Sequence, residues 1–129
     1  MIVDSSAVVA VLLREPGHEA LLSNLARAPG AGIGTPTLAE TGIVLVARLG
    51  ATGRTLLGRF IEEAEIVPVA FGERHWATAV EAYLRFGKGR HPAALNFGDC
   101  MTYATARLSG GDLLCVGDDF AKTDLPLVR

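Results

Sequence analysis

Residues 1–13, Met-Ile-Val-Asp-Ser-Ser-Ala-Val-Val-Ala-Val-Leu-Leu, contain the unit from which the fold is built. The apolar start at residues 1–3 predicts a short buried strand, and the polar residues 4–6 supply side chains that cap the N-terminus of a helix. The apolar run over residues 7–13 predicts that helix. The stretch therefore predicts a strand, a tight turn and a helix in direct succession.

The rest of the chain repeats this alternation. Further short strands are predicted at residues 31–34, 66–69 and 113–116, and further helices at residues 18–27, 35–50, about 52–64, 73–86 and about 99–110. Pro68 places the third strand near a sheet edge or strand end, because proline cannot donate to the ladder. Repeated strand–helix alternation favours an α/β fold, with a parallel sheet covered by helices on both faces.

Composition narrows the class of protein. A length of 129 residues, of which 50% are hydrophobic, fits a single domain over residues 1–129. The formal net charge of −2 argues against a strongly basic nucleic-acid binder, so any polyanionic partner must contact a local basic patch. Cys100 and Cys115 lack metal-ligand spacing, which fits a reducing cytoplasm. No signal-peptide pattern and no apolar run of the roughly 20 residues that span a bilayer is present, so no membrane association is expected.

Acidic residues recur where the predicted strands end. Asp4 follows the first strand, Glu40 lies one turn into the helix after the second, Asp99 opens the helix before the fourth, and Asp118-Asp119 follow the fourth. Because the turns after parallel strands share one edge of a sheet, we expect these carboxylates to converge. Clustered carboxylates repel one another unless a cation neutralises them, and hard oxygen ligands suit Mg²⁺ or Mn²⁺.

Each acid also has a purely structural explanation. Asp4 and Asp99 are natural helix N-caps, and Glu40 fits a Thr-x-x-Glu capping box with Thr37. The pair Asp118-Asp119 after a glycine fits an ordinary turn. Capping explains each acid singly, but it does not explain why the acids gather at one edge.

A loop between two predicted helices is rich in cations. Arg85, Lys88, Arg90 and His91 lie close together around two glycines at residues 85–91, so Lys88 and Arg90 are candidate contacts for the phosphates of a polyanionic partner. A solvated connecting loop is the alternative. In the preceding helix, the spacing of Trp76, Val80, Tyr83 and Leu84 predicts the buried face.

Four stretches carry a family resemblance: Met-Ile-Val-Asp-Ser-Ser-Ala at 1–7, Thr-Leu-Ala-Glu at 37–40, Leu-Asn-Phe-Gly-Asp-Cys at 95–100 and Gly-Asp-Asp-Phe-Ala-Lys-Thr-Asp-Leu at 117–125. In this order they resemble a PIN domain, specifically the VapC-type toxin of bacterial toxin–antitoxin pairs. The resemblance implies a three-layer α/β/α sandwich with a short, mainly parallel sheet of four to five strands. It also implies a Mg²⁺-dependent endoribonuclease acting on tRNA or other structured RNA, a VapB-type antitoxin partner and a homodimer.

The same resemblance assigns roles to the acids. Asp4 and Asp99 match the direct metal ligands, and Glu40 and a fourth acid complete the catalytic site through water or a second metal, one of them as general base. The family places its fourth aspartate directly before phenylalanine, which selects Asp119, with Asp118 as the alternative.

Ser6 matches a small hydroxyl position beside Asp4 and is a candidate substrate contact, or else a second capping hydroxyl. A receiver-like Mg²⁺-binding signalling module is an alternative function, although its acidic pair would follow the first strand rather than the last. A catalytically silent binding domain is a further alternative.

Overall fold

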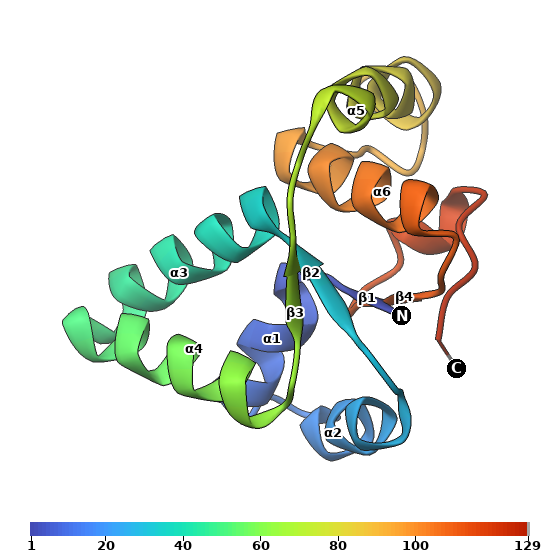
Figure 1. Cartoon of the computed structure of the whole chain (residues 1–129). Coiled ribbons are helices and arrows are strands. Elements are labelled where there is room, and N and C mark those ends of the chain that lie inside the picture. The colour runs from blue at the N-terminus through green and yellow to red at the C-terminus, as the bar shows by residue number, and fades with distance from the viewer. Residues whose placement is uncertain (129) are drawn as a thin grey trace.

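The computed structural model describes residues 1–128, and its centre is a small parallel sheet (Figure 1). The strands are β1 (Ile2–Val3), β2 (Gly32–Gly34), β3 (Val67–Val69) and β4 (Leu113–Leu114). Their order is β3-β2-β1-β4, and every neighbouring pair is parallel. The predicted parallel α/β fold is therefore confirmed, and β3, which contains Pro68, is an edge strand as its proline indicates.

Helices connect and cover these strands. They are α1 (Ser5–Leu12), α2 (His18–Arg27), α3 (Thr35–Leu49), α4 (Ala51–Glu63), α5 (Glu73–Phe86) and α6 (Phe97–Ser109), with a short 3₁₀ helix η1 (Phe120–Lys122) near the C-terminus. None of the helices within residues 1–128 is both long and apolar enough to cross a membrane.

The sheet separates two hydrophobic cores, because successive side chains of a strand point to opposite faces. Ile2 and Leu113 pack with residues of α5, α6 and the C-terminal segment. Val3 and Leu114 pack on the other face, with residues of α1 to α4. Figure 1 shows the two groups of helices on opposite sides of the strands, which is the expected three-layer arrangement.

Close packing between α3 and α4 explains the glycine at position 53. The helices α3 and α4 form an antiparallel pair after Gly50, whose φ of +71° suits a residue without a Cβ. A Cβ added at Gly53 would lie 2.5 Å from the carbonyl oxygen of Leu45. Gly53 therefore lets α4 approach the backbone of α3.

The predicted buried face of α5 is wrong. Trp76, Val80, Tyr83 and Leu84 are 58%, 51%, 44% and 52% exposed, whereas the buried residues of α5 are Ala79, Ala82 and Phe86. Alanine side chains bring α5 close to α6, its most extensive packing partner. The large apolar residues are consequently left on the outer surface.

Candidate active site

Asp4 lies at the carboxyl end of β1, where its backbone N–H donates to the carbonyl of Leu114 at 2.9 Å. Its carboxylate caps α1: Oδ2 accepts from the backbone N–H of Ser6 at 3.1 Å and from the Ser6 hydroxyl at 2.6 Å. On the other side, Oδ1 accepts from the Thr102 hydroxyl at 2.8 Å. Asp4 is only 4% exposed. Three donors thus hold a buried carboxylate in one orientation, and Asp4 is both a cap and a member of the acidic cluster.

A buried relay of hydroxyls joins this carboxylate to α3. Because the Thr102 proton is directed at Asp4, the Thr37 hydroxyl is the donor in the 2.9 Å bond between the two threonines. The Thr41 hydroxyl donates in turn to the Thr37 carbonyl at 2.7 Å. Thr102 is not among the site residues that the sequence predicts. Its position three residues after Asp99, on the same face of α6, was the available signal.

The same relay corrects the capping-box explanation of Glu40. The helix α3 begins at Thr35 with Gly34 as its N-cap and no side-chain cap, and the Thr37 hydroxyl bonds to Thr102 instead. The capping box with Glu40 is therefore wrong. The side chain of Glu40 lies over Gly98 of α6, since a Cβ added at Gly98 would overlap Glu40 Oε2 and lie 2.9 Å from its Cδ.

Asp99 lies in the first turn of α6 but does not open it. Asn96 is the N-cap: its backbone N–H donates to Asp99 Oδ2 at 3.0 Å, and the Asp99 N–H donates to Asn96 Oδ1 at 2.9 Å. Burial, followed by the charges of Asp4, Asp119 and Glu40, raises the pKa of Asp99 from 3.8 to about 6, although the Asn96 N–H opposes this. These acids therefore interact electrostatically at one place.

The raised pKa of Asp99 links metal-free stability to pH. Between about pH 4 and pH 6 the folded protein binds a proton at Asp99 that the unfolded chain has released. The free energy of unfolding of the metal-free protein therefore falls as pH rises through this window, and a bound cation opposes that loss by favouring the carboxylate.

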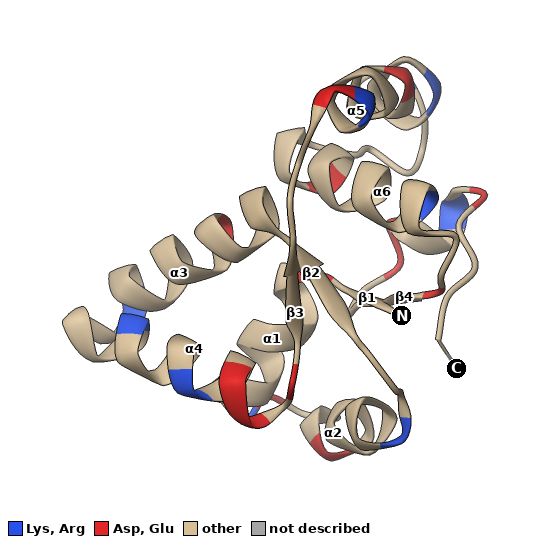
Figure 2. Cartoon of the chain, viewed as in Figure 1, with Lys and Arg blue, Asp and Glu red and all other residues tan. Residues whose placement is uncertain are grey.

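Two acids, Asp118 and Asp119, follow β4, and Asp119 is the one whose charge acts on the acidic cluster. The charge of Asp119 acts on Asp99 and also on Cys115, whose pKa rises to about 11 through burial and the charges of Asp4, Asp119 and Asp99. Asp118 is exposed, and its charge is not among those acting on either group. Figure 2 shows the acidic positions on α3, at the start of α6 and after β4 around the end of the sheet.

The donor set fits a hard divalent cation. Within residues 1–128, no group of three His, Cys, Asp or Glu side chains is arranged as a complete metal-binding set. Mg²⁺ commonly binds through one or two protein carboxylates and keeps several of its waters, so it does not require such a set. Asp4 and Asp99 supply carboxylate oxygens of this kind, and a cation would offset both the burial and the like charges that raise the pKa of Asp99.

The predicted substrate contacts have different surroundings. The Ser6 hydroxyl donates to Asp4 and accepts from the backbone N–H of Val116 at 3.0 Å, so it joins the start of α1 to the segment after β4. Lys88 and Arg90 are exposed on the loop after α5, where the Arg90 guanidinium lies 5.9 Å from the Tyr83 ring centre. In the part of the chain that the structure describes, no hydrogen bond or ion pair joins the side chain of Lys88 or Arg90 to the acids.

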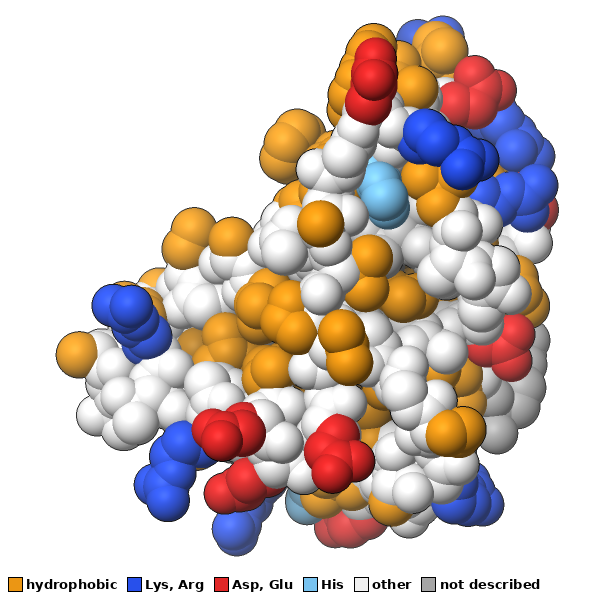
Figure 3. Space-filling view, viewed as in Figure 1, with side chains coloured by type: hydrophobic (Ala, Val, Ile, Leu, Met, Phe, Trp, Pro, Cys, Tyr) orange, Lys and Arg blue, Asp and Glu red, His pale blue; other side chains and the backbone are white. Residues whose placement is uncertain are grey.

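An apolar groove lies between α5 and α6, with a volume of about 570 Å³. Its lining includes the exposed Trp76, Val80 and Tyr83 of α5 and Phe97, which is 80% exposed and adjoins Gly98 at the start of α6. Figure 3 shows hydrophobic side chains exposed over this part of the molecule and basic side chains gathered beyond α5. We call the surface lined by these four side chains the α5–α6 groove.

The chain belongs to the PIN domain family, which it matches over residues 1–125. It is 51% identical over 126 residues to Ribonuclease VapC36 of Mycobacterium tuberculosis, covering 97% of this chain and 91% of that protein. It is 41% identical over 129 residues to Ribonuclease VapC of Mycolicibacterium smegmatis, with 100% of both chains covered. The receiver-like alternative is therefore left without support.

Solved structures agree on the fold. VapC20 of Mycobacterium tuberculosis, a sarcin-ricin loop cleaving toxin, superposes with a TM-score of 0.80 at 20% identity and covers 99% of this chain and 98% of its own. VapBC2 from Rickettsia felis, bound to a DNA fragment from its promoter, gives a TM-score of 0.78 at 15% identity and covers 98% of this chain and 96% of its own. Both likenesses concern the fold alone.

Proposed function

We propose that this protein is the toxin of a type II toxin–antitoxin pair and a Mg²⁺-dependent endoribonuclease, with Mn²⁺ able to replace Mg²⁺. The observation that carries the proposal is the convergence of Asp4, Glu40, Asp99 and Asp119, from separate segments, at a place where burial and like charge raise the pKa of Asp99 to about 6. The relatives named VapC ribonucleases support the reaction class.

The surroundings of each acid indicate its role in the site. Asp4 and Asp99 would hold the cation, with Asp4 oriented by Ser6 and Thr102 and Asp99 by the Asn96 N–H. When bound, Mg²⁺ lowers the pKa of a coordinated water and offsets the negative charge that develops on the scissile phosphate and the leaving oxygen.

Glu40 and Asp119 complete the acidic site around the attacking water. Neither carboxylate is fully buried, so each is free to contact that water. One of them accepts its proton as general base. The resemblance to VapC-type toxins implies products with 5′-phosphate and 3′-hydroxyl ends.

We infer that the substrate is tRNA or another structured RNA. Lys88 and Arg90 on their exposed loop would contact phosphates, so binding is expected to weaken as salt increases. Ser6, beside Asp4, would lie close to the RNA backbone at the scissile bond.

We infer two protein partners in the cytoplasm: a VapB-type antitoxin and a second copy of this chain. The fold likeness to a toxin–antitoxin complex from Klebsiella pneumoniae, with a TM-score of 0.70, supports the first. The α5–α6 groove supports the second, because water-exposed Trp76, Val80 and Phe97 favour burial. Light scattering of the purified toxin tests the homodimer, and a Trp76→Glu variant that elutes with the same mass as the native protein would exclude the groove as its interface.

The decisive experiment is cleavage of total tRNA by the purified, antitoxin-free protein. We expect discrete fragments with Mg²⁺ that disappear with chelator and with Asp99→Asn. Asp118→Asn is the matched control, because it removes the same charge from an exposed neighbour of Asp119 and should leave cleavage intact.

Cleavage that persists in Asp99→Asn or with chelator would refute the metal-dependent site. If no RNA is cut while Mg²⁺ raises the melting temperature of the native protein and not of Asp99→Asn, the acids bind a cation but the protein is a silent binding domain.

A further inference from the structure

The loop that carries Asp119 is fixed at both ends. At its start, the Val116 N–H donates to the Ser6 hydroxyl at 3.0 Å. At its end, the chain returns along β4, where the Leu113 N–H donates to the Pro126 carbonyl at 2.9 Å. Between these points the Asp119 side chain is exposed, so its position depends on how the loop is held against the helices.

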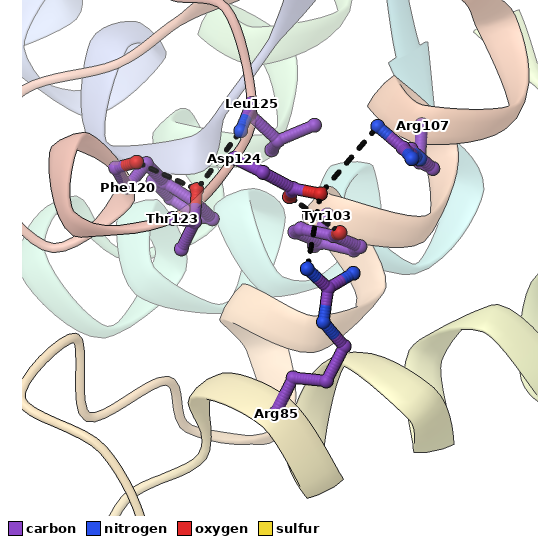
Figure 4. A network of polar contacts seen from close by, with 7 residues as sticks. All are labelled: Arg85, Tyr103, Arg107, Phe120, Thr123, Asp124 and Leu125. Atoms are coloured by element: carbon purple, nitrogen blue, oxygen red, sulfur yellow. Dashed lines mark hydrogen bonds and ion pairs between the residues drawn. The ribbon is translucent and has the colours of Figure 1, made fainter.

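Asp124 joins this loop to both helices of the adjacent layer (Figure 4). The Tyr103 hydroxyl of α6 donates to Asp124 Oδ1 at 2.7 Å. On the other oxygen, Arg85 of α5 donates to Oδ2 at 3.3 Å, and Arg107 of α6 lies 3.6 Å from it. We call Asp124 with these three partners the Asp124 clasp.

A short hydrogen-bonded turn connects Asp124 to η1. The Thr123 hydroxyl donates to the Phe120 carbonyl at 2.6 Å and accepts from the Leu125 N–H at 3.3 Å. Phe120 and Leu125, which flank this turn, are only 3% and 7% exposed. This turn therefore links Asp124 to η1, and Asp119 is the residue that precedes η1.

The clasp is built on the helix that carries another acid of the site. Tyr103 lies one turn after Asp99 on α6. The bond between Tyr103 and Asp124 thus connects the segment bearing Asp119 to the helix bearing Asp99. Although burial opposes ionisation, the Tyr103 hydroxyl and the two arginines hold the pKa of Asp124 below its ordinary value, so the clasp stays charged near neutral pH.

We propose that Asp124 is a positioning residue that sets the distance of Asp119 from Asp99, with Tyr103, Arg85 and Arg107 acting through it. The activity readout of this proposal rests on the proposed ribonuclease function. Partners that orient metal ligands typically change affinity or activity by about 10- to 100-fold when they are replaced.

The test compares Asp124→Asn with Asp112→Asn, which removes the same charge from an exposed aspartate outside the clasp. Hydrogen–deuterium exchange of residues 116–122 without metal should be faster in Asp124→Asn and unchanged in Asp112→Asn. Mn²⁺ affinity and RNA cleavage should each fall about 10-fold in Asp124→Asn. In an Asp119→Asn background the same change should cost less than about 2-fold in Mn²⁺ affinity, because its effect passes through Asp119.

Equal losses in both backgrounds, or unchanged exchange in the loop, would overturn the proposal. If Asp124→Asn fails to fold, Tyr103→Phe removes one donor while keeping the ring that packs 5.8 Å from Phe86, and the same comparisons apply. If the native protein neither binds Mn²⁺ nor cuts RNA, the proposed function fails, and loop exchange alone decides whether the clasp holds Asp119.

Discussion

A single methyl group added at Gly98 tests whether the position of the Glu40 carboxylate matters. In Gly98→Ala the new Cβ would overlap Glu40 Oε2 and lie 3.0 Å from Oε1. Both oxygens are at the far end of a flexible side chain, so we expect Glu40 to swing away while the backbone of α6 stays in place. The substitution thus displaces a carboxylate without removing any functional group.

The expected effects on stability and activity differ in size. Alanine is preferred over glycine within a helix by about 0.5–1 kcal/mol, and a strained Glu40 rotamer costs about 0.5–1.5 kcal/mol, so the free energy of unfolding should change by less than about 1 kcal/mol. Loss of a correctly placed acid or base lowers the rate at least about 100-fold, which corresponds to about 2.7 kcal/mol in the activation barrier. Cleavage should therefore fall while stability is nearly unchanged.

The assay measures cleavage rates and urea unfolding for four variants: Gly98→Ala, Gly58→Ala, Glu40→Ala and the double variant of Glu40→Ala with Gly98→Ala. Gly58→Ala is the matched control, because a Cβ there has nothing within 4 Å, and it should stabilise α4 by about 1 kcal/mol without affecting cleavage. In a Glu40→Ala background, Gly98→Ala should have no further effect on cleavage. Native-rate cleavage by Gly98→Ala, or an additional loss in the Glu40→Ala background, would contradict a role for the position of the Glu40 carboxylate.

Two further predictions concern the buried side of the site. In chelator, the free energy of unfolding of the native protein should fall relative to that of Asp99→Asn as pH rises from about 4 to 7. A pKa of about 6 for Asp99 limits this loss to about 3 kcal/mol, and partial solvent exposure reduces the expected loss to about 1 kcal/mol. Parallel melting curves against pH for the two proteins would contradict this. Thr102→Val should lower the free energy of unfolding in urea by about 1–3 kcal/mol, because it leaves Asp4 Oδ1 and the Thr37 hydroxyl without a partner. Thr102→Ser keeps the hydroxyl and should retain most of the native free energy of unfolding. A Thr102→Val protein as stable as the native one would show that the relay contributes nothing.

Short stretches of sequence were sufficient to predict the strands of the sheet. The apolar stretches at residues 1–3, 31–34, 66–69 and 113–116 contain the strands, although β4 is shorter than predicted. The acids at the ends of these strands could be anticipated to gather because parallel topology places those ends at one edge. These features depend on propensity and periodicity over a few neighbouring residues, which the sequence displays directly.

Contacts between residues that are far apart along the chain could not be predicted from the sequence. The Thr102 hydroxyl that orients Asp4 is 98 residues away from it. The outward position of Trp76 depends on Ala79 and Ala82 packing closely against α6.

The composition of the site therefore came from the sequence, and its geometry came from the tertiary structure. The strands, the helices and the presence of an acid after each relevant strand can be predicted from the sequence, because each is encoded within a few consecutive residues. Only the packing of α3, α5, α6 and the C-terminal loop decided which hydroxyl reaches Asp4, why position 98 has no side chain and how Asp124 holds the loop, because each of these contacts joins segments that meet only in the folded chain.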